Sequence, residues 1–329
     1  MSNLEAAPAE LACASPPASQ AAQGVQVLQP RAVPLGGPRA MTVRRTLPQR
    51  TRSLIGAWCF ADHYGPDDVS VSGGMQVAGH PHTGLQTVSW LFRGEIEHRD
   101  TTGAHAYVRP GELNLMTAGA GIAHSEYSTP ATTVLHGAQL WVALPQGHRF
   151  TTSAFEHYPP PVLDHDGARV LVFLGRLAGH TSPVRTFSPL LGAEITLRAG
   201  QTVELDVEPA FEHGVLVDTG RVTVAGTAAG AGQLIYQPVS ADTLTLHVSG
   251  EEQARVLVLG GEPLGEQIIM WWNFIGRSHD EMAAYRAQWQ AERAGNATPG
   301  TPRYGRFPAQ WDHTLPAPEL PGTRLRPRG

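Results

Sequence analysis

The feature that most constrains the fold of this chain is a succession of short β-rich runs separated by turn residues. Five of them read LQTVSWLFRGEIEHRD, TTVLHGAQLWVALP, ARVLVFLG, AEITLRAGQTVELDV and HGVLVDTGRVTVAG. Glycine and proline, with 36 and 27 copies among 329 residues, break the chain between such runs. Strands at this short, regular spacing predict an all-β fold, either a sandwich or a barrel.

One segment instead has helical periodicity, RSHDEMAAYRAQWQAERAG. The large apolar residues on one face of this helix are Met282, Tyr285 and Trp289. Ser278 and Glu281 have the S-x-x-E spacing of a capping box, in which side chains satisfy free backbone N–H groups at a helix start. Gly295 marks the end. We therefore expect a short C-terminal helix over about residues 278–294.

A weak internal repeat predicts two barrels in tandem. The first copy, SWLFRGEIEHRD followed by RPGELNLMTAG, resembles GVLVDTGRVTVAG followed by AGAGQLIYQPV. The first copy carries paired histidines, whereas the second has only the isolated His213. The proline-rich residues 158–168 mark the boundary. The expected domains are an N-terminal tail (1–32), a first barrel (33–157), a second barrel with the helix (158–295) and a C-terminal tail (296–329).

The two tails are expected from their composition. Residues 1–32 are rich in Ala, Pro, Ser and Gln and have almost no aromatics, so they cannot bury enough apolar surface to offset the entropy of ordering. The end of the chain is rich in Pro, Gly and Arg. Tyr304, Phe307 and Trp311 would nevertheless let this second tail drape over the core.

Composition and charge exclude several classes of function. The net charge of −5 gives no reason to expect nucleic acid as a partner. All 24 basic residues are arginine, which is typical of a GC-rich bacterial genome. Two cysteines, Cys13 and Cys59, are too few for a disulfide framework or a cysteine-based metal site. No apolar run reaches the ~18 residues of a membrane helix and no signal peptide is evident, so we expect a cytoplasmic protein.

Two pairs of potential metal ligands stand out. His80 and His82 flank a proline just before a predicted strand, and His124 and Glu126 follow in AGAGIAHSEYS. Alternate residues of a strand share a face, so each pair presents both side chains to one side. One His-x-His pair can arise by chance among 15 histidines. The second pair, also preceded by a glycine-rich turn, favours a metal site of three imidazoles and one carboxylate.

The ligand types indicate which ion such a site suits. Three imidazoles and a carboxylate fit a divalent transition metal such as Fe, Mn, Ni or Cu, with Co or Zn as alternatives, and fit Mg or Ca poorly. The net charge of about +1 favours an anionic ligand such as a phenolate or enolate. Other histidines of this half lack the paired context, and we expect structural roles for them: His63, His98, His105, His136 and His148.

These motifs resemble those of a known family. Residues 74–82, GMQVAGHPH, with Gly94 after them look like the first cupin motif, and residues 111–124 resemble the second. The similarity is more specifically to the pirin family in HPHTGLQTVSWLFRGEIEHRDTTG, RPGELNLMTAGAGIAHSEYS, QLWVALP, RRTLPQRTRSLIGAWCFADHYGP and GEPLGEQIIMWWNFIGRSHDEM. It extends over about residues 34–285 and is densest between residues 35 and 145.

The resemblance implies a bicupin, with two antiparallel jelly-roll β-barrels in tandem. It also implies one metal, usually iron and so Fe(II) here, in the N-terminal barrel and none in the C-terminal barrel, in agreement with the asymmetric repeat. The family's ligands fall on His80, His82, His124 and Glu126. In an octahedral shell they leave two positions for water, substrate or O2.

Two positions depart from the family pattern. Many pirins carry a glutamate shortly after His-x-His, where this chain has Gln86. Strand alternation places Gln86 on the histidine face, where we expect a hydrogen bond to a ligand or simple core filling. The family's QWMTAG reads NLMTAG here, so Leu115 replaces an aromatic residue beside Met116. We expect Gln86, Leu115 and Met116 to line the substrate pocket.

Two functions from different classes remain open. Some pirins are similar in activity to quercetin 2,3-dioxygenases, which suggests a dioxygenase that opens flavonol-type, enolizable aromatic substrates with O2, with Glu126 as proton acceptor. Others are metal-dependent partners of transcription factors or metabolic enzymes, which suggests a redox-sensing regulator. A basic stretch could serve that interface, although a solvated strand edge is the simpler interpretation: Arg39, Arg44, Arg45, Arg50 and Arg52.

Overall fold

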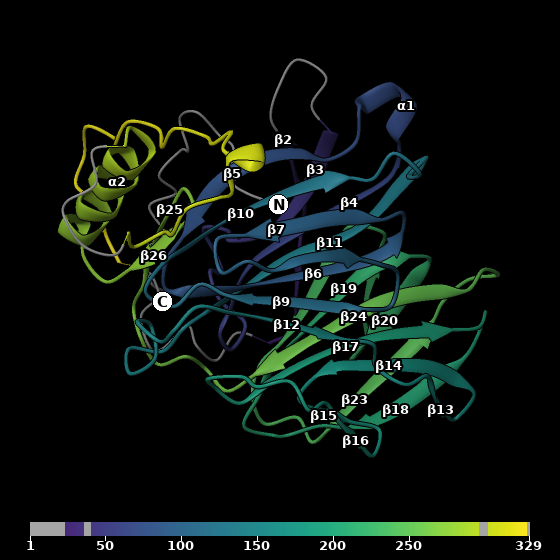
Figure 1. Cartoon of the computed structure of the whole chain (residues 1–329). Coiled ribbons are helices and arrows are strands. Elements are labelled where there is room, and N and C mark those ends of the chain that lie inside the picture. The colour runs from purple at the N-terminus through teal and green to yellow at the C-terminus, as the bar shows by residue number, and fades with distance from the viewer. Residues whose placement is uncertain (1–23, 36–40, 296–301, 328–329) are drawn as a thin grey trace.

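Two β-barrels lie against each other, and the C-terminal helix packs beside the first of them (Figure 1). The computed structural model describes residues 24–35, 41–295 and 302–327. Neighbouring strands in both barrels pair antiparallel. The predicted all-β bicupin fold with a short C-terminal helix is confirmed. No helix among the described residues has the length and apolar character needed to cross a membrane.

The first barrel combines a larger and a smaller sheet, with strand orders β12-β9-β6-β11-β4-β3-β2 and β5-β10-β7-β8. The strands of the larger sheet are β2 (Arg31–Leu35), β3 (Met41–Leu47), β4 (Trp58–Asp68), β6 (Leu85–Arg93), β9 (Leu113–Thr117), β11 (Val134–Ala143) and β12 (Ala154–Tyr158). Those of the smaller sheet are β5 (Gln76–His82), β7 (Ile96–Asp100), β8 (His105–Val108) and β10 (Ile122–Ser128). A single helical turn, α1 (Val69–Ser72), follows β4.

The second barrel repeats this arrangement, with strand orders β1-β22-β19-β24-β17-β14-β13 and β18-β23-β20-β21. The larger sheet contains β1 (Gln26–Leu28), β13 (Leu163–His165), β14 (Ala168–Leu174), β17 (Leu190–Leu197), β19 (Glu212–Thr219), β22 (Leu234–Gln237) and β24 (Ala254–Gly261). The smaller contains β18 (Thr202–Asp206), β20 (Arg221–Val224), β21 (Thr227–Gly230) and β23 (Thr243–Val248). A short hairpin, β15 (Arg176–Leu177) and β16 (His180–Thr181), completes it.

An apolar layer between the two larger sheets joins the barrels. Two tryptophans of the first barrel anchor it through their indole N–H groups. Nε1 of Trp58 donates to the carbonyl oxygens of Leu191 and Gly260 at 3.2 and 3.1 Å, and Nε1 of Trp90 donates to Oε2 of Glu194 at 2.8 Å. A buried indole N–H needs such an acceptor, so these bonds hold the two sheets in one relative position.

The N-terminal segment contributes a strand to each barrel. β1 pairs with β22 of the second barrel, and β2 pairs with β3 of the first. Residues 26–28 and 31–32 of the expected tail over 1–32 are therefore part of the sheets, whereas residues 1–23 lie outside the described residues. The average composition of the segment did not indicate these strands, because its apolar residues are concentrated in VQVLQPRAV. Leu28 and Val33 of this stretch are buried in the core.

The C-terminal elements return to the first barrel. The C-terminal cluster is aromatic and is formed by β25 (Ile269–Trp271), β26 (Phe274–Gly276) and α2 (His279–Arg293). Phe274 of β26 is bridged to Thr83, the residue that follows β5. Ser278 caps α2 by accepting the backbone N–H of Glu281 at 3.2 Å, as the capping box predicts. The residues buried by α2 are the predicted Met282, Tyr285 and Trp289.

Residues 302–327, part of the expected tail over 296–329, pack against α2 and reach the outer edge of β5 at residues 313–315. The N–H of Gly79 donates to the carbonyl of His313 at 3.0 Å, and the N–H of Leu315 donates to the carbonyl of Gly79 at 2.7 Å. Tyr304 is fully buried. A short 3-10 turn spans Ala309–Trp311. Because β5 is an edge strand, these bonds satisfy backbone groups that the sheet leaves open.

Candidate metal centre

The four predicted ligands lie on two neighbouring strands of the first barrel. β5 carries His80 and His82, and its antiparallel partner β10 carries His124 directly opposite His80. Glu126 follows a register shift between β10 and β5. All four side chains are fully buried. Strand alternation thus points both pairs into the barrel interior, as expected.

The three imidazoles converge closely enough to share one ion. The ring centroid of His80 lies 4.3 Å from that of His124 and 5.0 Å from that of His82. The Nε2 atoms of His82 and His124 are 3.1 Å apart, and Nε2 of His80 is buried without a hydrogen-bond partner among the described residues. Such a nitrogen calls for an explanation, and a metal ion held by all three rings supplies one. The donor set therefore fits a transition metal.

Burial keeps these imidazoles neutral. It lowers the pKa of His80 to about 4, and burial together with the nearby His80 lowers the pKa of His82 and His124 well below the ordinary value. Nδ1 of His80 lies 2.9 Å from the carbonyl oxygen of Ala78, and Nδ1 of His82 lies 3.1 Å from that of Asn273. A carbonyl only accepts, so Nδ1 carries the hydrogen and Nε2 keeps its lone pair for a metal.

Glu126 brings a carboxylate to the same interior. One of its oxygens and one ring nitrogen each of His124 and His98 lie within 4.8 Å of one another. Oγ of Ser89 lies 3.1 Å from Oε1 of Glu126 and 2.9 Å from Oε1 of Gln139. A hydroxyl has one hydrogen, so Ser89 donates to one of these oxygens at a time. His124 thus belongs to two groups of potential ligands, one with His80 and His82 and one with Glu126. The second group also contains His98, for which we expected only a structural role.

An aromatic wall lies next to the histidines. The ring of Trp141 meets that of His82 edge-on, with 5.2 Å between centroids, and stacks on Phe60 at 4.1 Å. Behind Phe60, Arg45 and Asp62 form a buried bidentate ion pair at 2.7 and 2.8 Å. The interior of the first barrel therefore combines metal-binding groups with flat apolar surfaces.

Leu115 and Met116, both expected to line the substrate pocket, point to opposite sides of β9. Met116 packs in the same cluster as Trp141, inside the first barrel. Leu115 packs in the apolar layer between the barrels. The expectation for Leu115 is wrong because consecutive residues of a strand face opposite sides of the sheet.

Gln86 also lies on the inter-barrel side of its strand. It alternates with Val88, which belongs to the apolar layer between the barrels, and its Nε2 donates to Oγ1 of Thr117 at 2.9 Å. Counting alternate residues from His82 fails because Gly84, with a φ of +73°, turns the chain between β5 and β6. The expected place of Gln86 on the histidine face is therefore corrected.

A second histidine cluster lies between the barrels. Oδ1 of Asp218, from the second barrel, lies 2.7 Å from Nε2 of His63 and 2.6 Å from Nε2 of His136. Arg255 binds the other oxygen at 2.6 Å, and Nε of Arg44 donates to Nδ1 of His63 at 3.2 Å. Nδ1 of His63 therefore accepts, and its Nε2 carries the hydrogen. The cluster therefore forms a hydrogen-bonded link between the barrels. It disfavours a bound metal ion, because two guanidinium groups are positively charged and Nε2 of His63 has no lone pair to offer.

The basic stretch does not form an exposed basic surface. Arg45 is buried in its ion pair, Arg44 donates into the inter-barrel cluster, and Arg52 lies over an aromatic ring of the second barrel. Arg50 is exposed, and Arg39 lies outside the described residues. Arg44, Arg45 and Arg52 therefore serve contacts within the chain.

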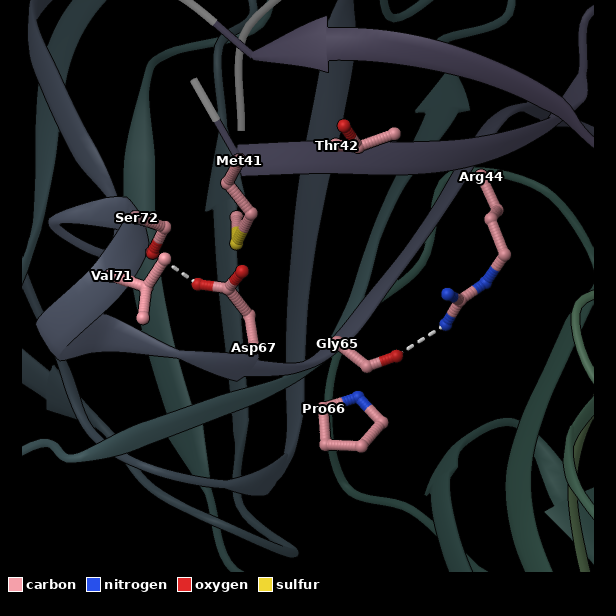
Figure 2. A pocket seen from close by; sticks show the side chains of 8 residues that line it. All are labelled: Met41, Thr42, Arg44, Gly65, Pro66, Asp67, Val71 and Ser72. Atoms are coloured by element: carbon pink, nitrogen blue, oxygen red, sulfur yellow. Dashed lines mark hydrogen bonds between the residues drawn. The ribbon is translucent and has the colours of Figure 1, made fainter. Parts of the chain in front are cut away.

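A cavity of about 400 Å³ lies on the outside of the first barrel (Figure 2). It is lined by Met41, Thr42, Arg44, Gly65, Pro66, Asp67, Val71 and Ser72. Its polar groups are paired with one another, since Arg44 donates to the carbonyl of Gly65 and Ser72 donates to Asp67. None of the predicted site residues lines it.

The interior of the second barrel has a different character. Its buried cluster consists of valine, leucine, isoleucine and alanine. His213 is fully buried, and neither of its ring nitrogens has a hydrogen-bond partner in the part of the chain that the structure describes. Within the described part of the chain, no group of three potential metal ligands lies in the second barrel alone.

Two family models match this chain. The model described as Pirin matches residues 40–142, and the model described as Pirin C-terminal cupin domain matches residues 192–295. Together these ranges cover more than half of the sequence and correspond to parts of the two barrels.

Named proteins are similar over most of the chain. A Pseudomonas aeruginosa protein named "Putative quercetin 2,3-dioxygenase" is 42% identical over 298 residues, which are 90% of this chain and 91% of that protein. A "Pirin-like protein" of Caulobacter vibrioides is 35% identical over 260 residues, or 76% of this chain and 88% of that one. The crystal structure of quercetin 2,3-dioxygenase from Acinetobacter baumannii has a TM-score of 0.84 at 35% identity and covers 93% of this chain and 99% of its own.

Proposed function

Because this chain belongs to the pirin family, we propose that it is a metal-dependent dioxygenase that opens flavonol-type, enolizable aromatic substrates with O2. One observation carries the proposal: three buried, neutral imidazoles converge in the first barrel, and a carboxylate lies beside one of them. The names of the similar proteins from P. aeruginosa and A. baumannii support the choice of substrate class.

His80, His82, His124 and Glu126 are the proposed ligands of one divalent first-row ion. Iron(II) is the proposed ion, and Mn, Ni, Cu, Co and Zn are the others to be tested. When bound, such an ion acts as a Lewis acid on a substrate hydroxyl and supplies redox chemistry toward O2.

The chain itself has two tasks in this scheme. Glu126 accepts the proton of the substrate hydroxyl on a carboxylate oxygen, while Ser89, 3.1 Å from Oε1, donates to the carboxylate and orients it. Trp141, which stacks on Phe60, provides a flat apolar face that excludes water and against which an aromatic substrate can pack.

The test is turnover of quercetin by iron-loaded protein. The absorbance of quercetin should bleach with consumption of O2, and His80→Ala should lose bound metal and activity together. His148→Ala is the control, because this exposed histidine of the same barrel is not a proposed ligand. Turnover that persists in a metal-free His80→Ala variant would overturn the assignment.

The regulatory alternative predicts a different result from the same material. Iron-loaded protein would retain its metal without bleaching quercetin, and one stoichiometric protein would be captured from the native lysate. Three of the five arginines considered for that interface, Arg44, Arg45 and Arg52, are engaged in contacts within the chain.

A further inference from the structure

The three imidazoles of the metal centre are not oriented by the same kind of group. Nδ1 of His80 and Nδ1 of His82 each face a main-chain carbonyl oxygen. Nδ1 of His124 instead lies 3.4 Å from Nδ1 of His98. A metal-binding imidazole is oriented by the acceptor at its other nitrogen, so the third ring depends on a side chain.

His98 is itself held in place on both sides. Its Nε2 lies 3.1 Å from Oδ2 of Asp100, and its ring stacks on Phe155 with 4.7 Å between centroids. His98 is 2% exposed and Asp100 is fully buried. A buried carboxylate is costly unless it is well bonded, so the location of Asp100 calls for a specific role.

The bonds of Asp100 divide between its two oxygens. Oδ1 accepts from the backbone N–H and the hydroxyl of Thr102 at 2.8 and 2.6 Å, and from the N–H of Ala104 at 3.2 Å. Oδ2 is directed at His98. The sheet register brings this pair to the metal centre, because β7 pairs with β10 so that Asp100 lies opposite His124.

The donors and acceptors along this chain of bonds have one consistent assignment. A carboxylate only accepts, so His98 carries its hydrogen on Nε2 and presents the lone pair of Nδ1 to His124. His124 then carries its hydrogen on Nδ1, and its Nε2 lone pair points toward His82. This is the tautomer that coordination through Nε2 requires.

We propose that His98 and Asp100 are positioning residues of the metal centre. Asp100 selects the tautomer of His98, and His98 selects the tautomer and orientation of His124. The proposal rests on the proposed metal site and names residues that are not ligands. Both nitrogens of His98 are engaged, one by His124 and one by Asp100, so neither is free for an ion.

Asp100→Asn is the sharpest test. The amide has nearly the volume of the carboxylate, and its oxygen can still accept the bonds from Thr102 and Ala104. Its NH2 group, however, donates to Nε2 of His98, which moves the hydrogen of His98 to Nδ1, where it opposes Nδ1–H of His124. We expect Co2+ to bind about 10- to 100-fold more weakly in competition with a chromogenic chelator.

Two substitutions of His98 separate hydrogen bonding from packing. His98→Leu removes the acceptor and should weaken Co2+ binding to a similar degree, whereas His98→Gln offers an amide oxygen and should recover part of the affinity. NMR of the Co2+-loaded protein gives an independent readout. The exchangeable Nδ1–H signal of His124 should exchange faster with solvent in His98→Leu, while those of His80 and His82 stay unchanged.

A matched histidine–carboxylate pair on the neighbouring strands serves as the control. Nε2 of His105 lies 2.6 Å from Oε1 of Glu97, on the outer side of the same sheet. His105→Gln and Glu97→Gln should leave Co2+ affinity unchanged. Thermal unfolding of each metal-free variant checks that the fold is kept, and Asp100→Asn and His98→Gln provide the test if His98→Leu does not fold.

Each remaining outcome has a defined meaning. Wild-type Co2+ affinity in both Asp100→Asn and His98→Leu would overturn the proposal. Loss of binding in His98→Leu as complete as in His80→Ala would also overturn it, because His98 would then be a ligand. Wild-type protein that binds no Co2+ would instead refute the metal site, which is a separate result.

Discussion

The two barrels share an arrangement of sheets but have opposite interiors. The first encloses a group of buried polar side chains: His80, His82, Ser89, His98, Asp100, His124, Glu126 and Gln139. The second encloses aliphatic side chains, with His213 buried at β19. Burying polar groups costs free energy that an aliphatic interior avoids. The second barrel shows that this fold forms with an aliphatic interior. The polar interior of the first barrel therefore needs another explanation, which a bound ion provides.

The largest effect should come from giving the second barrel a carboxylate. Val217 is fully buried among aliphatic residues, so Val217→Glu inserts a carboxyl group without a polar partner. We expect urea denaturation to show a loss of ~4 kcal/mol or more in the free energy of unfolding. In the first barrel, the metal-free Glu126→Gln variant should lose only about 1 kcal/mol. Equal losses would break the contrast between the interiors.

The next effect concerns the cluster that joins the barrels. Burial alone would raise the pKa of Asp218, but bonds from His136 and His63 hold it well below the ordinary value. Asp218→Asn leaves Arg255 without its carboxylate partner and should cost ~3 kcal/mol at neutral pH. A lowered folded pKa adds stability above the ordinary pKa of ~3.9, and this stability is lost as the pH falls further.

Urea unfolding of the wild type and Asp218→Asn at several pH values checks this prediction. The two free energies of unfolding should converge below about pH 4, where the wild-type carboxylate loses its advantage. A difference that grows toward acid would show that the cluster does not act through the charge of Asp218.

A smaller, pH-dependent effect should come from the second barrel's buried histidine. Burial lowers the pKa of His213 from 6.5 to about 4. Above about pH 6.5 the ring is neutral in both the folded and the unfolded state, so it makes no pH-dependent contribution. As the pH falls toward 4, the unfolded state binds a proton that the folded state does not, and stability declines by about 2 kcal/mol between pH 6.5 and 5. His213→Met should remove this decline and leave stability at pH 7 unchanged or higher. Urea unfolding at both pH values measures it, and an undiminished decline in the variant would count against the assignment.

The smallest expected difference, about 1–2 kcal/mol, is between alanine substitutions of one glycine from each barrel. A Cβ on Gly260 would lie 3.1 Å from Cδ2 of His213 and 3.2 Å from Cβ of Leu191, so Gly260→Ala should cost about 1 kcal/mol. A Cβ on Gly137 would lie 2.7 Å from the carbonyl oxygen of Trp90, so Gly137→Ala should cost about 2–3 kcal/mol. Thermal unfolding ranks the two, and the reverse order would make the second barrel the more tightly packed.

Local patterns predicted much of this molecule correctly. Short strand runs and glycine turns indicated the barrels, and the S-x-x-E spacing at Ser278 indicated the start of α2. Both signals depend only on residues close together in the sequence, and the local backbone geometry of strands and helix ends is the same in all proteins. The strands at residues 26–28 and 31–35 were not fully predicted, because a composition averaged over the whole N-terminal segment hid their few apolar residues.

The candidate site was only partly predicted, because strand alternation is also a local pattern. Alternation holds within a strand, so each ligand pair was placed on one face, but it failed for Gln86 across the turn at Gly84. His98 and Asp100 have the same two-residue spacing as the ligand pairs and would have been found by the same count. Asp218 could not be assigned to His63, since 155 residues separate them in the chain.

The amino-acid sequence by itself determined which side chains share a face, because strand and helix periods follow from local backbone geometry. Only the tertiary structure decided which faces meet: β5 beside β10, His98 behind His124, and the C-terminal segment along the edge of β5. Those contacts arise from the packing of segments far apart in the chain, which no local pattern encodes.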